Sequence, residues 1–244
     1  MPLFRRLFDF QKSQLPQLEH RLSQRFTAGR TFPLQAAVYA DGHGWPGRVQ
    51  NLSATGAGLL LGHQAAPRVG QVGRLHLELD QYELELNTRI AHVEAHAEGW
   101  LCGLGLSFDD FTAQKTHLQL LQPIALGSSL RPVAAGPVAG APATCLVYSG
   151  ESGAELSVWR AGPPGAGWHH FEFALRDYLV RAAADTRGLE VLPRPPGGPA
   201  GSAPPTDLNE DTKAEIRQLF RWIVPNLPES MPADVRVFLQ GFAH

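Results

Sequence analysis

Alternating apolar and polar residues dominate the first half of the chain. The run RLHLELDQYELELNTRIAHVEAH, residues 74–96, places Leu75, Leu77 and Leu79 and then Leu84 and Leu86 between polar neighbours, which predicts two long half-buried strands. The shorter runs FPLQAAVYA, RVQNL, AGLLLG and WLCGLGLSF flank them, and turn-rich stretches such as DGHGWPG separate them. Such strands, followed by the helical pattern TAQKTHLQLLQPIA, predict a small antiparallel β-barrel with a closing helix.

The two ends of the chain show helical periodicity instead. Residues 1–26 carry apolar side chains at a helix-like but imperfect spacing, and Pro16 is expected to break or restart that helix. Residues 207–244 predict two short amphipathic helices. Their apolar faces comprise Ile216, Leu219, Phe220 and Ile223 in the first and Val235, Phe238 and Leu239 in the second. The predicted fold class is therefore mainly β with flanking helices.

Stretches rich in proline and glycine divide the chain into segments. Residues 127–142 and 193–206 are predicted to be linkers, the second of them disordered. They separate a barrel domain at 27–126 from a second β-rich segment at 143–192 and a helical segment at 207–244. The second segment offers about four strands, with WHHFEFALRDYLVRAAA counted as one. A second small barrel, an extension of the first sheet and an interaction hairpin all stay open for it.

Composition narrows the classes of partner. The net charge of −2 and the absence of an aromatic–basic pattern argue against nucleic acid, and 43% hydrophobic with 18% charged residues is ordinary for a soluble globular protein. Two separated cysteines, no signal peptide and no membrane-spanning segment predict a cytoplasmic protein. The short N-terminal piece FRRLFDF is expected to pack on the protein rather than attach to a membrane.

Catalytic motifs and metal-binding spacings are not found. His92 and His96 are four residues apart, but on the predicted strand that spacing separates them by about 13 Å. His169 and His170 would point to opposite faces of a strand and so would not clamp one ion. Asp109 and Asp110 are expected to cap the closing helix. We therefore predict no catalytic residues, no metal site and no enzyme.

Two features carry candidate chemistry. Arginines at positions 21, 25 and 30 precede the first strand, and NLSATGAG, residues 51–58, interrupts two strands with polar groups and glycines. Each has a plain explanation, because arginines complement a helix C-terminus and Asn, Ser and Gly favour turns. Their combination and order resemble the PilZ domain, the bacterial receptor module for cyclic di-GMP.

The resemblance covers about residues 25–125. PilZ domains carry R-x-x-x-R before the first strand and [D/N]-x-S-x-x-G further along, and Asn51-x-Ser53-x-x-Gly56 matches the second motif. Gly58 followed by three leucines fits the next strand of the family. The stretch GLGLSFDDFTAQKTHLQLL is similar to the family's terminal strand, acidic turn and helix.

The first motif departs from the family pattern. Arg30 lies at the expected distance before the second motif, but R-x-x-x-R spacing would require arginine at position 26, which is Phe26. Arg25 is one residue out of register, and Gly29 is available to absorb the extra residue. Arg21 and Arg25 have the family spacing, but that pair lies early, on the predicted helix.

The resemblance implies a cyclic di-GMP receptor that needs no cofactor. Guanidinium groups fork onto phosphate or guanine edges and stack on bases, while amide and hydroxyl groups supply donors and acceptors. Gly56 is expected to serve backbone geometry more than contact. The implied ligand contacts are Arg25, Arg30, Asn51, Ser53 and Gly56, with weaker candidates at Arg21, Arg48 and Gly58.

Two functional hypotheses follow from different classes. In the first, nucleotide binding at the barrel alters contact with an unidentified protein partner, in motility, surface attachment or polysaccharide export. In the second, a PilZ-like adaptor no longer binds nucleotide and docks on a partner through its C-terminal helices. Convergence of the arginines on Asn51 and Ser53 favours the receptor, and arginines paired with acidic side chains elsewhere favour the adaptor. Homo-oligomer formation stays open.

Overall fold

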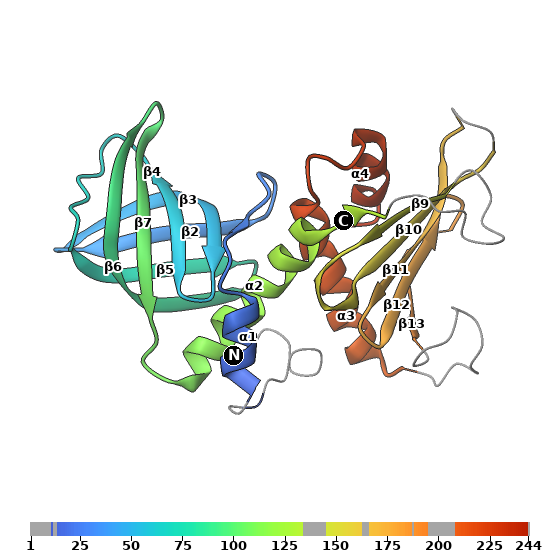
Figure 1. Cartoon of the computed structure of the whole chain (residues 1–244), viewed down its shortest axis with the longest axis horizontal. Helices are drawn as coiled ribbons and strands as arrows, with labels where there is room; N and C mark the ends of the chain where they lie inside the picture. The colour runs from blue at the N-terminus through green and yellow to red at the C-terminus, as the bar shows by residue number, and fades with distance from the viewer. Residues whose placement is uncertain are drawn as a thin grey trace. The chain divides into compact units, whose positions relative to one another are not determined.

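The computed structural model describes residues 11, 14–133, 145–162, 166–186, 188–194 and 208–243 of the 244-residue chain. The chain divides into two units, Met1–Ile124 and Ala125–His244, each with its own sheet. Both sheets are antiparallel, so the fold is mainly β with helices, as the sequence predicts (Figure 1).

The first unit is a closed six-stranded barrel. Its strands pair in the order β3-β2-β5-β6-β7-β4, and a further ladder between β3 and β4 closes the sheet on itself. A short seventh strand, β1, pairs with β3 outside this ring. The strands are β1 (Phe26–Thr27), β2 (Leu34–Ala40), β3 (His43–Ser53), β4 (Gly56–Leu61), β5 (Val72–Leu79), β6 (Tyr82–His96) and β7 (Gly99–Ser107).

Apolar and polar residues alternate along the strands, so the apolar side chains fill the barrel interior. Leu75, Leu77 and Leu79 of β5 and Leu86 of β6 are buried, which confirms the predicted period of two. The stretch DGHGWPG, in contrast, is mostly strand rather than turn. Only its first two residues turn the chain, with Asp41 at φ 50° and its neighbouring glycine at φ 78°, because this left-handed pair matches the twist of a tight hairpin.

Two helices flank the barrel strands in sequence, α1 (Leu15–Arg21) and α2 (Phe111–Ser129). Pro16 lies in the first turn of α1, and the expected helical stretch before it lies mostly outside the described residues. Asp110 caps α2, since its Oδ1 accepts a hydrogen bond of 2.8 Å from the Ala113 amide. Asp109 instead accepts hydrogen bonds from Asn87 and Arg74.

The second unit contains one open, six-stranded sheet, which differs from all three arrangements left open by the sequence. Its strands follow in chain order, β13-β12-β11-β10-β9-β8. WHHFEFALRDYLVRAAA is a hairpin rather than one strand, because the chain turns at Arg176, which adopts a left-handed φ of 54°. The strands are β8 (Arg131–Pro132), β9 (Cys145–Ser149), β10 (Glu155–Arg160), β11 (Trp168–Leu175), β12 (Tyr178–Ala183) and β13 (Glu190–Pro193), with a short 3-10 turn η2 (Glu151–Gly153).

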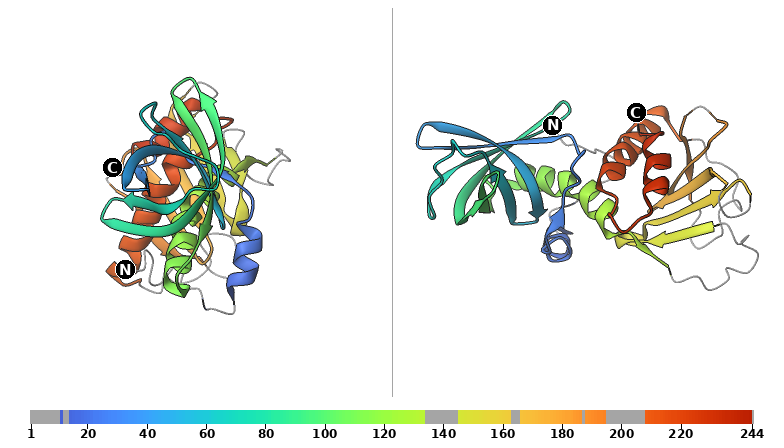
Figure 2. Two further views of the ribbon diagram at one scale, coloured as in Figure 1. Left: turned by 90° about the vertical axis from the view of Figure 1, so that its left-hand side faces the viewer. Right: turned by 90° about the horizontal axis from the view of Figure 1, so that it is seen from above.

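The C-terminal helices α3 (Glu210–Ile223) and α4 (Ala233–Gln240), joined by the 3-10 turn η3 (Val224–Asn226), cover one face of this sheet (Figure 2). Phe220 stacks on Phe171 of β11 with ring centroids 5.3 Å apart, and Phe238 meets the same ring edge-on at 6.1 Å. The predicted amphipathic helices are thus confirmed. Their apolar faces pack within their own unit, which removes one argument for the adaptor hypothesis.

Several segment boundaries differ from the sequence prediction. The linker expected from residue 127 begins inside α2, and β8 follows it, while residues 134–142 lie outside the described residues. Most of the linker expected at 193–206, the N-terminal stretch 1–10 and its FRRLFDF piece also lie outside them. In the part of the chain that is described, no helix has the length and apolar character needed to span a membrane.

Candidate functional site

The motif Asn51-x-Ser53-x-x-Gly56 forms the hairpin between β3 and β4. The antiparallel register pairs Asn51 with Gly58 and Ser53 with Gly56, and two residues turn the chain between them. Because directly opposed residues and alternate residues share a face of a sheet, all four positions lie on one face of this hairpin. The structure therefore brings the predicted motif residues and Gly58 together.

The arginine-bearing segment pairs with the same hairpin. In β1, Phe26 lies opposite Leu52, and Thr27 lies opposite Asn51. Backbone hydrogen bonds extend this pairing in both directions, from the Ala28 amide to the Gln50 carbonyl at 3.3 Å and from the Ala54 amide to the Leu22 carbonyl at 2.8 Å. The segment from 22 to 28, which contains Arg25, thus runs antiparallel to the motif strand, and Arg30 follows shortly after its end.

Arg25 and Arg30 lie on either side of β1. Arg25 immediately precedes β1, and Arg30 lies in a turn closed by a hydrogen bond of 3.0 Å from the Phe32 amide to the Gly29 carbonyl. Both side chains are exposed. Neither guanidinium group has a hydrogen bond or an ion pair to another described residue. Two charged forks beside the motif are therefore available to an anionic or guanine-bearing ligand.

The two weaker arginine candidates are placed differently. The guanidinium group of Arg48 forms an ion pair of 3.3 Å with Glu98, so part of its hydrogen-bonding capacity is already used. Arg21 is the last residue of α1, whereas Arg25, which was predicted to lie on the same helix, follows its end. Arg48 is a residue of β3, three positions before Asn51, and pairs with Leu60 of β4.

Asn51 presents an unsatisfied polar atom at the centre of this arrangement. Its Oδ1 is buried and accepts no hydrogen bond from the described residues. The side chain lies directly over Gly58, where an added Cβ would come within 2.7 Å of Nδ2. Because a buried acceptor without a partner is costly, this amide is a strong candidate for a ligand contact.

Ser53 and Gly56 shape the hairpin rather than present free groups. Ser53 is 5% exposed, and its hydroxyl donates a hydrogen bond of 3.3 Å to the Gly56 carbonyl. A Cβ on Gly56 would lie 3.1 Å from the Leu104 carbonyl oxygen of β7. Glycine therefore lets β4 pack closely against β7, in line with the expected role in backbone geometry.

Sequence reasoning missed one residue at this site, His117 of α2. Its Nε2 is 2.9 Å from the carbonyl oxygen of Ser53, and the side chain is completely buried. Burial lowers the pKa of the imidazole to about 4, against a smaller raising effect of the hydrogen bond to Ser53. No local pattern marks this histidine, since helix α2 reaches the hairpin only through the tertiary fold.

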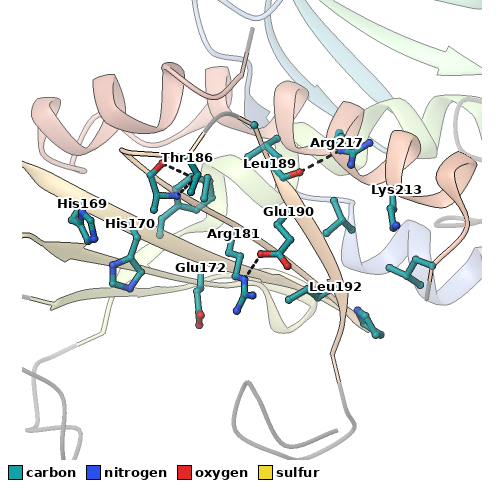
Figure 3. A pocket seen from close by; sticks show the side chains of 17 residues that line it. His169, His170, Glu172, Arg181, Thr186, Leu189, Glu190, Leu192, Lys213 and Arg217 are labelled. Atoms are coloured by element: carbon teal, nitrogen blue, oxygen red, sulfur yellow. Dashed lines mark hydrogen bonds and ion pairs between the residues drawn. The ribbon is translucent and has the colours of Figure 1, made fainter. Parts of the chain in front are cut away.

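A pocket of about 820 Å³ lies in the second unit, beside the edge strand β13 and the start of α3 (Figure 3). Several of its charged side chains are engaged: Arg181 donates to Glu190 at 2.7 Å, and Arg217 donates to the Leu189 carbonyl at 3.4 Å. Lys213 pairs with Glu210 at 2.9 Å. None of the residues predicted from the sequence lines this pocket, so the hairpin site of the first unit is the stronger candidate.

The first unit is thus a closed six-stranded barrel that carries an arginine segment against an N-x-S-x-x-G hairpin. Residues 19–122 match the family model of the PilZ domain. This part of the chain is a PilZ domain, which confirms the family assignment made from the sequence.

Two solved structures are also similar to the chain. One is the crystal structure of the PilZ domain of CeSA from a cellulose-synthesising bacterium, at 24% identity and a TM-score of 0.33, covering 41% of this chain and 96% of that chain. The other is the Borreliella burgdorferi PlzA protein in complex with c-di-GMP, at 10% identity and a TM-score of 0.34, covering 71% and 87%. No curated protein matches the chain. Because these identities and TM-scores are low, the assignment rests on the match to the family model and not on the two structures.

Proposed function

We propose that this protein is a receptor for cyclic di-GMP and that the nucleotide binds at the β3–β4 hairpin of the PilZ barrel. The observation that carries the proposal is the pairing of the arginine segment with the motif strand, which puts Thr27 opposite Asn51. Arg25 and Arg30 supply unpaired guanidinium groups, and Asn51 supplies an unsatisfied buried acceptor. The bound PlzA structure, a protein at 10% identity, adds no weight of its own.

The residue types suit the chemistry of this ligand. Cyclic di-GMP has two phosphates and two guanines, and a guanidinium group can fork onto phosphate oxygens or onto guanine O6 and N7. The Asn51 amide can accept from a guanine N–H or donate to a base acceptor. Each charge-assisted contact contributes about 1.5–3 kcal/mol, so the loss of one arginine should weaken binding by at least about tenfold.

The extra residue between the arginines falls where the backbone can absorb it. Strand pairing fixes Phe26 and Thr27 against β3, but it ends after the Ala28 amide. The turn from Gly29 to Phe32 then carries Arg30 outside the ladder. The spacing between Arg25 and Arg30 is therefore set by a turn rather than by a strand, and one added residue does not shift the register of β1.

A path for the output begins in the same unit. The Leu22 carbonyl, just after α1, accepts from the Ala54 amide of the hairpin turn, and Glu19 of α1 accepts a hydrogen bond from Gln114 of α2. Ordering of the arginine segment by a ligand would therefore constrain α1 and its contact with α2. We propose that a protein partner reads this change, in the cytoplasm, where the two free thiols Cys102 and Cys145 persist.

The adaptor hypothesis rested on the imperfect arginine spacing and on the C-terminal helices. The helices use their apolar faces within the second unit, and the turn after β1 can accommodate the extra residue between the arginines. Neither Arg25 nor Arg30 is paired with an acidic side chain in the described structure. We therefore put forward the receptor alone.

Isothermal titration with cyclic di-GMP tests the proposal. We expect micromolar or tighter binding by the wild type, at least tenfold weaker binding by Arg30→Ala and Arg25→Ala, and no binding of cyclic di-AMP at the same concentrations. Arg68→Ala, an exposed arginine in the β4–β5 loop, is the matched control and should bind like the wild type. Absence of heat and of a thermal shift at saturating ligand would refute the receptor.

A further inference from the structure

The buried face of the motif hairpin is held by one side chain from a distant part of the sequence. His117 of α2 lies 64 residues from Ser53, and its Nε2 contacts the Ser53 carbonyl oxygen at 2.9 Å. The imidazole also packs against Phe108, with ring centroids 5.5 Å apart. Ser53 is the second defined residue of the N-x-S-x-x-G motif. His117 therefore contacts the backbone of the motif and not the proposed ligand.

The chemistry of the contact fixes the tautomer of His117. A carbonyl oxygen only accepts hydrogen bonds, so Nε2 must carry the proton and donate it. The imidazole is neutral because complete burial disfavours its charged form, and Nδ1 is therefore a bare acceptor. Nδ1 is buried and has no partner among the described residues. The single useful hydrogen bond of this side chain is thus the one to Ser53.

That hydrogen bond acts on the part of the hairpin that the ligand would use. The Ser53 carbonyl belongs to the two-residue turn that separates Ser53 from Gly56, and the next amide, that of Ala54, is bonded to Leu22. His117 of α2 and Leu22 of the arginine segment therefore hold the carbonyl oxygen and the N–H group of the same peptide unit. A movement of either side is transmitted to the other through this peptide.

We propose that His117 is a positioning residue of the nucleotide site: it holds the Asn51–Ser53 hairpin in its binding geometry and transmits ligand occupancy to α2. The inference rests on the proposed function for the identity of the ligand. His117 does not contact the nucleotide. It acts through the Ser53–Ala54 peptide, which joins the hairpin to the arginine segment.

Two variants of equal bulk separate the hydrogen bond from packing. In His117→Gln the amide Nε2 can take the place of the ring Nε2 and donate to Ser53, whereas His117→Leu fills the space without a donor. We expect His117→Gln to bind cyclic di-GMP within about threefold of the wild type and His117→Leu to bind at least tenfold more weakly. Thr112→Ala, an exposed change on the same helix, should bind normally. Equal binding by both His117 variants would overturn the proposal.

A second readout does not depend on affinity. Long-range ¹H–¹⁵N spectra of the histidine ring should show a neutral His117 with its proton on Nε2, even without ligand. Hydrogen exchange of α2 residues 111–122 should slow on addition of cyclic di-GMP in the wild type and in His117→Gln, but not in a folded His117→Leu or His117→Asn protein. A proton on Nδ1, or ligand protection of α2 that persists in His117→Leu, would contradict the proposal.

The proposed receptor function and the proposed role of His117 can be refuted independently. If the wild type binds no cyclic di-GMP, the proposed function is refuted, and with it the transmission of ligand occupancy. The anchoring of the hairpin is then decided by the Nε2–H tautomer and by exchange of the Ala54 amide, which should be faster in His117→Leu than in His117→Gln.

Discussion

Asn51 and Gly58 face each other across the β3–β4 ladder, so closely that a Cβ atom on residue 58 would lie 2.7 Å from Nδ2 and 2.8 Å from Oδ1 of Asn51. The absence of a side chain at Gly58 leaves room for the Asn51 amide, whose Oδ1 is buried and has no hydrogen-bond partner among the described residues. Gly58, two residues after the N-x-S-x-x-G motif, therefore leaves the space that the Asn51 side chain occupies.

Gly58→Ala is predicted to damage binding more than folding. The new methyl group meets the flexible end of one side chain, so Asn51 can rotate away while the strand keeps its register. We expect affinity for cyclic di-GMP to fall at least tenfold, about 1.4 kcal/mol, with little change in melting temperature. In an Asn51→Ala background the same substitution should cost almost nothing further. Additive losses in this double-mutant cycle, measured by calorimetry, would show that Gly58 acts independently of Asn51.

Stability of the first unit should depend on pH through His117. Its pKa is lowered to about 4 in the folded protein from 6.5 in the unfolded chain, chiefly by burial. The unfolded state then binds the proton first, so the contribution is fully present above about pH 6.5 and is lost as pH falls toward 4. The loss is on the order of 3 kcal/mol.

Thermal unfolding between pH 7 and pH 4 checks this sign. His117→Gln has no titrating group at this position, so its melting temperature should fall less steeply than that of the wild type over this range. Parallel curves for the two proteins would mean that His117 is protonated in the fold or is not buried.

Phe220→Ala is predicted to weaken the second unit without affecting the nucleotide site. Phe220 is almost fully buried, stacks on Phe171 and meets Phe173 edge-on at 6.2 Å. Removal of this ring should cost about 3–5 kcal/mol of unfolding free energy in that unit. Denaturant unfolding is the measurement, and Val237→Ala on the exposed side of α4 is the control. A parallel loss of cyclic di-GMP affinity in a folded Phe220→Ala protein would contradict a site confined to the barrel.

The two cysteines should differ in reactivity. Cys102 of β7 is completely buried, and burial raises the pKa of its thiol to about 11, so almost no thiolate is present at neutral pH. Cys145 is half-buried, and burial raises its pKa as well. A thiol reagent should therefore modify Cys145 slowly in the native protein and Cys102 only in denaturant. Rapid labelling of Cys102 would show that the barrel opens readily.

Much of the barrel could be predicted from the sequence because its strands obey a period of two over long runs. Leu75, Leu77 and Leu79 face the interior as the alternation requires. The errors arose where turns left little trace in composition. Arg176 turns the β11–β12 hairpin at φ 54° without a glycine or asparagine, so two strands were counted as one. In β3, glycine and proline suggested a longer turn than the two residues that form it.

The site was predictable to the extent that its residues are close in sequence. Asn51, Ser53 and Gly56 share one hairpin, and their spacing alone places them on one face. The pairing of Thr27 with Asn51 and the contact of His117 with Ser53 depend on closure of the barrel and docking of α2. Such contacts join residues that are far apart in the chain, so a local sequence pattern cannot predict them.

The central claim concerns where the nucleotide binds, and side-chain NMR tests it most directly. In ¹⁵N spectra of the wild-type protein, addition of cyclic di-GMP should shift the Asn51 Nδ2 signals and the Nε signals of Arg25 and Arg30, together with backbone amides of 25–32 and 50–58. The Nε signal of Arg68 should stay in place. Saturable binding that leaves Asn51 and both arginines unmoved, and instead shifts residues of the second unit, would contradict the account.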